Sequence, residues 1–224
     1  MSVLYIVATP IGNLKDITLR ALEVLKEVDL VLAEDTRVAR KLLSYYGIHK
    51  PIKRYDENIK EKVHRKIADY LLKGRKVALL SDAGTPVISD PGAGLVNYLT
   101  KIQISNIKII PIPGASALTA ALSIAGVEVN GFTFVGYPPH KKKRQKFFNQ
   151  LKEIRIKPIV LYESPHRFQK TLSDLGEVFG DDSRVVIARE LTKIHEEVFR
   201  GNLKQASLYF VGDKIRGEFV IILL

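Results

Sequence analysis

The chain has 224 residues, of which 46% are hydrophobic and 26% charged, and this composition excludes a disordered chain or a fibrous repeat. It contains no cysteine, which excludes disulfides, thiolate metal sites and a cysteine nucleophile and fits a reducing compartment. The formal net charge of +11 favours a polyanionic partner.

The first half alternates short apolar runs with amphipathic helical patterns. The apolar runs predict strands buried on both faces, and helical patterns separate them, the last ending before Gly74. This order predicts an α/β fold with a mainly parallel, doubly wound sheet that binds ligands beyond the carboxyl ends of its strands. The predicted strands are 3–9, 30–33, 76–80 and 108–112, and the predicted helices are 17–28, 36–46 and 59–73.

The first apolar run, residues 3–9, has no basic segment before it. It is also too short for a signal peptide or a membrane span. We therefore expect a cytoplasmic protein with no membrane association.

A second series of elements follows Pro113 and Gly114. We place a domain boundary there, with an N-terminal α/β domain at 1–114 and a C-terminal α/β domain at 115–224. The predicted helices are 115–125, 142–152, 166–179 and 203–210, and the predicted strands are 132–137, 158–162, 184–188 and 219–223.

Residues 81–94 form a long small-residue loop after the strand at 76–80. Small residues let the backbone approach a ligand, and the carboxylates of Asp82 and Asp90 accept hydrogen bonds from hydroxyl or amine groups. The loop lacks the P-loop lysine and the third glycine of a dinucleotide fingerprint. It therefore favours a ligand with amine, hydroxyl or sulfonium groups.

Other loops at the same sheet edge have weaker signals. Residues 9–14 turn after the first strand, and 113–117 lead into a helix whose first N–H groups favour an acceptor, but both are also ordinary connections. Asp35 fits a helix N-cap best, and Arg37 could face a phosphate.

Ion pairs are the ordinary expectation for the charged residues at 188–197. No histidine pair has metal-ligand spacing, so we expect surface histidines and no metal.

Residues 141–157 contain eight Lys or Arg and only one acidic residue, Glu153. Cations at the predicted helix start oppose the helix dipole, and phosphate binding would explain that cost. A solvated face or the general composition of a lysine-rich organism remains the alternative. We expect Phe147 and Phe148 to be core anchors rather than base-stacking platforms.

Six segments together resemble the tetrapyrrole methylase family, and within it a group that methylates small-subunit ribosomal RNA. Their order and spacing span nearly the whole chain. The segments are 7–14 with 16–18, 33–37, 81–86 continued through 90–92, 113–117, 162–167 and 188–193.

The resemblance implies two α/β domains with S-adenosyl-L-methionine in the cleft between them, a homodimer, and methylation of a cytidine ribose 2′-hydroxyl in small-subunit (16S) ribosomal RNA. Ribosomal RNA or the small ribosomal subunit would be the partner. Many group members continue beyond the position of Leu224, so we expect any RNA contact made there to be missing. By position, the residues implied for the methyl donor are Pro10, Ile11, Asp82, Ala83, Gly84, Thr85, Ser116 and Ala117, with Tyr162 and Ala188 as weaker transfers.

Attack of a ribose oxygen on a sulfonium methyl group needs positioning and a proton acceptor. Our candidates for the base are Glu190, Lys193 and Asp35, of which Lys193 would need a lowered pKa. Two alternatives stay open: a methyltransferase for a tetrapyrrole or other small molecule, and a non-catalytic ribosome assembly factor. The candidate phosphate ligands are Arg37, Lys141, Lys142, Lys143, Arg144, Lys146 and Arg189.

Overall fold

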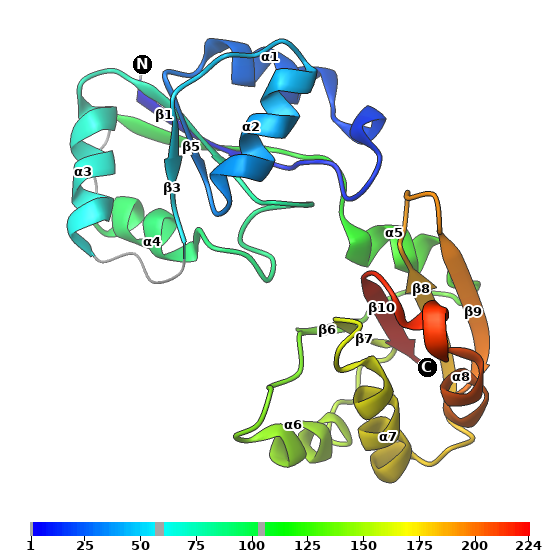
Figure 1. Ribbon diagram of the computed structural model, residues 1–224. Helices are drawn as coiled ribbons and strands as arrows, with labels where there is room; N and C mark the ends of the chain where they lie inside the picture. The colour runs from blue at the N-terminus through cyan, green and yellow to red at the C-terminus, as the bar shows by residue number, and fades with distance from the viewer. Residues whose placement is uncertain (1, 57–60, 103–105) are drawn as a thin grey trace. The chain divides into compact units, whose positions relative to one another are not determined.

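The computed structural model describes residues 2–56, 61–102 and 106–224 (Figure 1). The chain divides into two compact units, Met1–Ser116 and Ala117–Leu224. The division lies close to the boundary predicted at Gly114. Each unit has its own five-stranded sheet and its own helices.

The first unit has a parallel sheet with the strand order β3-β2-β4-β1-β5. All five strands therefore end at the same edge, as the sequence predicts. The elements are β1 (Ser2–Val7), η1 (Leu14–Asp16), α1 (Leu19–Glu27), β2 (Leu30–Ala33), α2 (Thr36–Tyr45), β3 (Ile52–Arg54), α3 (Glu61–Leu72), β4 (Lys76–Leu80), α4 (Ala93–Lys101) and β5 (Ile107–Ile112).

Alternate side chains of each central strand pack on opposite faces of this sheet. In β4, Ala78 and Leu80 join the core cluster that includes α1 and α2, whereas Val77 and Leu79 join the cluster with α3 and α4. Figure 1 shows these helix pairs on the two sides of the sheet. Continuous apolar runs are the pattern expected for strands covered on both faces.

The second unit has a mixed sheet with the order β6-β7-β10-β8-β9. Strands β6 and β7 are parallel, and the other neighbours are antiparallel. The mainly parallel order predicted from the first half therefore does not extend to this half. The elements are α5 (Ala117–Ser123), β6 (Thr133–Gly136), α6 (Arg144–Leu151), β7 (Ile159–Glu163), α7 (Phe168–Phe179), β8 (Arg184–Arg189), β9 (Glu197–Asn202), α8 (Leu203–Tyr209), η2 (Gly212–Ile215) and β10 (Phe219–Leu223).

Aromatic rings form the centre of the second core. Phe168 stacks on Phe219 with ring centroids 3.9 Å apart and meets the edge of Phe210 at 5.1 Å. Phe148 is fully buried and Phe147 packs against the same cluster, so both are core residues as predicted. Large buried rings supply much of the burial that holds a small unit together.

Two strands and one α-helix were missing from the sequence prediction, namely β3, β9 and α4, as were the short 3-10 helices η1 and η2. Part of α4 was assigned to the loop at 81–94, because Gly92 and Gly94 flank its start. The predicted helix at 59–73 is α3, although residues 59 and 60 lie outside the described residues. None of the helices in the described part of the chain is both long enough and apolar enough to cross a membrane.

Candidate functional site

The loops after β1 and β4 are joined by backbone hydrogen bonds. Thr9 N–H donates to the Gly84 carbonyl at 2.8 Å, and Gly84 N–H donates back to the Thr9 carbonyl at 3.0 Å. The hydroxyl of Ser81 also donates to the Gly84 carbonyl at 2.8 Å. Gly84 has φ +80°, a backbone conformation that side-chain-bearing residues rarely adopt. This glycine therefore fixes the turn at the sheet edge.

The loop after β5 joins the same assembly. The Thr85 hydroxyl donates to the Ala115 carbonyl at 3.3 Å. A Cβ on Gly114 would lie 2.9 Å from the Cβ of Ala8, and a Cβ on Gly84 would lie 3.4 Å from Cγ2 of Ile11. The structure thus brings together loops that the resemblance assigns to the methyl donor from three separate parts of the sequence.

The remaining donor candidates of the first unit differ in exposure. Pro10 and Ile11 are buried and Ala83 is exposed. Ser116 is the last residue of the first unit, and Ala117 begins α5 in the second.

Asp82 links the end of β4 to the end of β2. Its Oδ1 accepts a hydrogen bond from the Asp35 N–H at 3.1 Å. A pocket of about 380 Å³ opens beside this pair. The sequence indicated neither Glu34 nor Arg54 as a site residue. The lining residues are Glu34, Asp35, Thr36, Arg37, Arg54 and Asp82.

Asp35 is the N-cap of α2, as predicted, and its Oδ1 accepts from the Arg37 N–H at 2.8 Å. Its Oδ2 also pairs with the Arg37 guanidinium at 2.6 Å. The Arg37 side chain and then its backbone N–H hold the pKa of Asp35 far below its ordinary value. A carboxylate stabilised in this way is a weak proton acceptor, which argues against Asp35 as the base.

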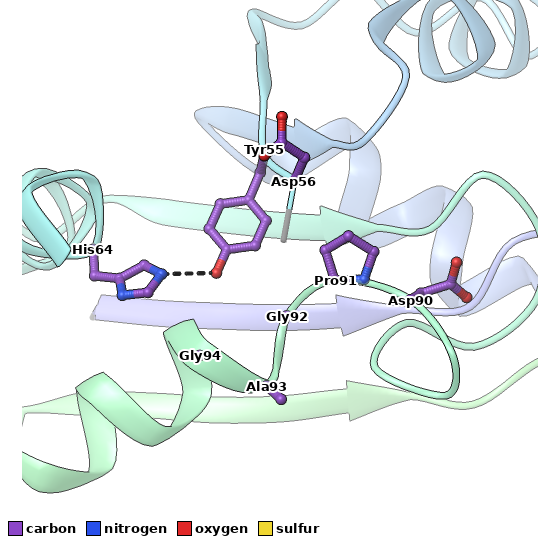
Figure 2. A pocket seen from close by; sticks show the side chains of 8 residues that line it. All are labelled: Tyr55, Asp56, His64, Asp90, Pro91, Gly92, Ala93 and Gly94. Atoms are coloured by element: carbon purple, nitrogen blue, oxygen red, sulfur yellow. Dashed lines mark hydrogen bonds between the residues drawn. The ribbon is translucent and has the colours of Figure 1, made fainter. Parts of the chain in front are cut away.

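The far end of the loop at 81–94 lines a second pocket of about 260 Å³, shown in Figure 2. Here the Tyr55 hydroxyl and His64 Nε2 are 3.0 Å apart, and a Cβ on Gly94 would lie 3.2 Å from Cε1 of His64. Asp90 lines this pocket, whereas Asp82 lines the other one. The two aspartates of the loop therefore do not share a single pocket.

His64 is half-buried, which corrects the prediction that all five histidines lie on the surface, and burial lowers its pKa. The other four are exposed. Among residues 2–56, 61–102 and 106–224, no group of three or more His, Cys, Asp or Glu side chains could hold a metal ion.

In the second unit, the loop after β8 contains a three-residue charge cluster. Lys193 Nζ lies 2.7 Å from Glu190 Oε1 and 2.9 Å from Glu218 Oε2. The Glu218 N–H donates to Glu190 Oε1 at 3.0 Å. The sequence prediction missed Glu218, since it lies 28 residues along the chain from Glu190.

The pKa directions in this cluster decide which group can accept a proton. Burial pulls the pKa of Lys193 down, but the hydrogen bonds and charges of Glu190 and Glu218 outweigh burial and hold it above its ordinary value. Burial raises the pKa of Glu190, but Lys193 and the Glu218 N–H outweigh it and lower that pKa. Lys193 therefore lacks the lowered pKa that it would need to act as a base, and this prediction is wrong.

Gly217 sets the position of the Glu190 side chain. An added Cβ on Gly217 would overlap Cδ, Cγ and Oε1 of Glu190. Gly217 has φ +88°, and Glu190 itself has φ +50°. Non-glycine residues in this region are uncommon and tend to occur where the surrounding structure determines the backbone, so the Glu190 carboxylate is held in a defined place.

Arg189 does not fit the predicted role of phosphate ligand. It is 9% exposed, its Nε donates to the Arg216 carbonyl at 2.7 Å, and its guanidinium pairs with Glu197 at 3.1 Å. The charges at 188–197 form ion pairs, as ordinary chemistry predicts. Arg189 thus fixes the loop rather than facing solvent.

The two donor candidates of the second sheet lie in different settings. Tyr162 accepts a hydrogen bond from the Leu118 N–H at 3.0 Å and packs against the rings of Phe134 and Tyr137. Ala188 is buried inside β8.

Arg144 also corrects a predicted RNA contact. It is 5% exposed and pairs with Asp174 at 2.6 Å, so its charge is not available to a phosphate. Helix α6 begins at Arg144 rather than at residue 142. The sequence signal could not separate this inward cation from its neighbours. The other cations of the run are exposed, namely Lys141, Lys142, Lys143, Lys146, Lys152, Arg155 and Lys157.

The comparisons with known proteins agree with one another. A family model described as Tetrapyrrole (Corrin/Porphyrin) Methylases matches residues 3–207. A relative from Thermotoga maritima named Ribosomal RNA small subunit methyltransferase I is 46% identical over 224 residues, covering 100% of this chain and 98% of the relative. A relative of the same name from Bacillus subtilis is 42% identical, covering 99% of this chain and 75% of the relative.

Solved structures show the same fold at low identity. A cobalt precorrin-4 methyltransferase has a TM-score of 0.69 and 18% identity, covering 99% of this chain and 94% of that one. A uroporphyrin-III C-methyltransferase from Thermus thermophilus has a TM-score of 0.65 and 17% identity, covering 99% and 94%. The chain belongs to the tetrapyrrole methylase family, because the family model matches most of it and a named relative matches its whole length.

Proposed function

We propose that the chain is an S-adenosyl-L-methionine-dependent methyltransferase that acts on the ribose 2′-hydroxyl of a cytidine in small-subunit (16S) ribosomal RNA. The observation that carries this proposal is the 42–46% identity, over nearly the whole chain, to relatives named ribosomal RNA small subunit methyltransferase I. Ribosomal RNA or the small ribosomal subunit is then the partner.

The joined loops of the first unit fit the methyl donor. S-adenosyl-L-methionine supplies a methyl group on a positively charged sulfonium, and it also carries an amino group and ribose hydroxyls. The Asp82 carboxylate suits a cationic or hydroxyl-bearing ligand. The small residues Ala83 and Gly84 let the backbone approach it closely. Ile11 lies against Gly84 and is the apolar candidate for contact with the ligand.

Glu190 is the candidate proton acceptor that we retain. Its pKa is lowered, as that of Asp35 is, but Arg37 binds both carboxylate oxygens of Asp35, whereas Lys193 and the Glu218 N–H both bind Oε1 of Glu190. A carboxylate is the ionised form at neutral pH, whereas Lys193 with its raised pKa is protonated there. Lys193 and the Glu218 N–H orient Glu190, and Gly217 limits where it can lie. Such fixed geometry favours proton removal from a hydroxyl placed within hydrogen-bond distance.

The exposed cations supply the electrostatic attraction for RNA. Lys141, Lys142, Lys143 and Lys146 are exposed and lie within a short part of the chain. The Arg37 side chain is 86% exposed, and its ion pair with Asp35 is of the surface type that contributes little to stability. Arg37 can therefore exchange its carboxylate partner for a phosphate. These groups add affinity for RNA without recognising a particular nucleobase.

The donor position between the two domains, the homodimer and the cytoplasmic location stay predictions. The fold neighbours with tetrapyrrole names share only 17–18% identity, so they support the fold and not a tetrapyrrole substrate.

The test is calorimetric titration with S-adenosyl-L-methionine, followed by labelled-methyl transfer to unmodified small ribosomal subunits. Binding and transfer to a cytidine ribose are the expected results. If S-adenosyl-L-methionine binds but no methyl group is transferred to ribosomal RNA, the proposed acceptor is wrong. If it does not bind, the result would favour a ribosome assembly factor without catalytic activity.

The RNA surface has a separate test. Replacing Lys141, Lys142 and Lys143 together by Gln should weaken RNA binding and flatten its salt dependence, with donor affinity unchanged. The matched control replaces three exposed lysines of the first unit by Gln, namely Lys62, Lys66 and Lys73.

A further inference from the structure

Two arginines hold consecutive carbonyl groups just before the exposed lysines. Arg167 donates to the Pro138 carbonyl at 2.7 Å, and Arg144 donates to the Pro139 carbonyl at 3.0 Å. We call residues 138–143 the basic segment. The two arginines come from positions that follow this segment in sequence, one at the start of α6 and the other directly before α7.

Both arginines are in turn fixed by buried partners. Arg144 pairs with Asp174 at 2.6 Å and donates to the Thr171 hydroxyl at 2.8 Å. The Thr171 hydroxyl donates to Glu163 Oε2 at 2.6 Å, and Arg167 pairs with Glu163 Oε1 at 3.0 Å. The Glu163 side chain is fully buried. These five residues form one connected polar network between β7, α6 and α7.

Local sequence does not account for the conformation of the basic segment. Lys143, the residue before α6, has φ +67° and makes no side-chain cap hydrogen bond. Neighbouring lysines also repel one another, which favours a spread of conformations. Buried ion pairs are often no more stabilising than apolar side chains of the same size, so a network of this kind is better explained by the conformation that it specifies.

We propose that Glu163, Thr171 and Asp174 act through Arg144 and Arg167 as positioning residues that hold the basic segment in one conformation for RNA phosphates. This inference rests on the proposed RNA substrate. Prearranged cations bind a polyanion more tightly, because less conformational freedom is lost on binding. The network therefore sets how many phosphates Lys141, Lys142 and Lys143 bind together.

The experiment uses variants that keep the net charge. Arg167→Lys keeps one positive charge but loses the fork that bridges Glu163 and the Pro138 carbonyl. Thr171→Val removes the hydroxyl between Glu163 and Arg144 at nearly constant shape, and it serves as the second variant if Arg167→Lys does not fold. The control, Arg155→Lys, makes the same substitution at an exposed arginine.

Four quantities are measured on each full-length variant. Two report on the basic segment, namely amide hydrogen exchange at residues 140–143 and tryptic cleavage after Lys141 to Lys143. The other two are RNA affinity over a range of salt and S-adenosyl-L-methionine affinity. We expect faster exchange and cleavage, RNA affinity lower by roughly tenfold, and a salt slope smaller by about one for each phosphate that the variant no longer binds. Donor affinity should not change, and Arg155→Lys should match the wild type throughout.

The outcomes separate this inference from the proposed function. Unchanged exchange and cleavage in both network variants would overturn the positioning role. Faster exchange with unchanged RNA affinity would also overturn it, provided that the triple lysine variant does lose affinity. If the triple lysine variant keeps full RNA affinity, the RNA role of the segment is wrong and this inference is overturned with it.

Discussion

The backbone N–H of Asp35 donates a hydrogen bond to the Asp82 carboxylate at 3.1 Å. This bond joins the loops that follow two neighbouring parallel strands, β2 and β4. Asp82 therefore has two separable properties, an acceptor oxygen that fixes the Asp35 loop and a negative charge that lines the adjacent pocket.

Asp82→Ala should weaken S-adenosyl-L-methionine binding by at least tenfold, because a hydrogen bond to a charged group contributes about 1.5–3 kcal/mol. Asp82→Asn keeps an acceptor for the Asp35 N–H but loses the charge, so its loss should be smaller. Calorimetric titration measures both. Asp90→Ala is the control, since Asp90 lines the other pocket. Wild-type affinity in Asp82→Ala would remove this loop from the donor site.

Gly217→Ala should abolish most methyl transfer while leaving donor affinity intact. The new Cβ would occupy the space of the Glu190 carboxylate and displace it. We expect a rate loss comparable with that of Glu190→Gln, of order 10²-fold or more if Glu190 is the base. Single-turnover transfer to small ribosomal subunits measures the rate.

Gly212→Ala is the matched control for this substitution. Gly212 also has a positive φ, at +56°, but an added Cβ there meets no atom within 4 Å. Both variants bear the backbone cost of a side chain at positive φ, and only Gly217→Ala moves Glu190. Equal rates in the two variants would contradict the assignment of Glu190.

Lys193 should not titrate in the pH range where the enzyme is assayed. The lowered pKa of Glu190 means that its stabilising contribution is present above about pH 4.3 and is lost as the pH falls through its lower folded value. The raised pKa of Lys193 means that its contribution is present below about pH 10.4 and is lost as the pH rises through its higher folded value. The cluster is therefore intact across neutral pH.

The measurement is the transfer rate from about pH 6 to pH 9, a range in which the ordinary pKa of neither side chain falls. The profile of the wild type and that of Lys193→Met should have the same shape, even if Lys193→Met is slower because Glu190 is less well oriented. An inflection in the wild type that disappears in Lys193→Met would show that Lys193 exchanges its proton during the reaction.

The sequence predicted the first sheet well because its strands are covered on both faces. Runs such as residues 30–33 and 76–80 are apolar without alternation, and both are buried strands. The missed strands lack that signal. β3 has only three residues at the sheet edge, and β9 has only two adjacent apolar residues, Val198 and Phe199, between polar residues and a glycine. Edge strands are partly exposed, so their sequence is less distinctive.

The candidate site was predictable as a set of loops but not as a set of contacts. Motif positions indicated Asp82, Gly84 and Thr85, and the structure joins their loop to those after β1 and β5. The directions of charged side chains were not predictable. Arg144 and Lys143 are adjacent cations, yet one is buried and the other exposed, because only Arg144 reaches Asp174 on α7.

Arg144→Met should destabilise the protein by about 3–5 kcal/mol, because it leaves the Asp174 carboxylate without its buried partner. It also removes the hydrogen bonds to the Thr171 hydroxyl and the Pro139 carbonyl. Lys146→Met, at an exposed position of the same helix, should change stability by no more than about 0.5 kcal/mol. Urea unfolding followed by circular dichroism measures both.

The same two variants should also differ in how they bind RNA. Lys146→Met removes an exposed charge, so its RNA affinity should fall and its salt slope should flatten, with no loss of stability. Arg144→Met should lose stability first, and its RNA affinity should fall only through the altered basic segment. If Arg144→Met is as stable as the wild type, Arg144 is not held by Asp174 in solution. The buried ion pair would then not exist, and Arg144 would rejoin the candidate phosphate ligands.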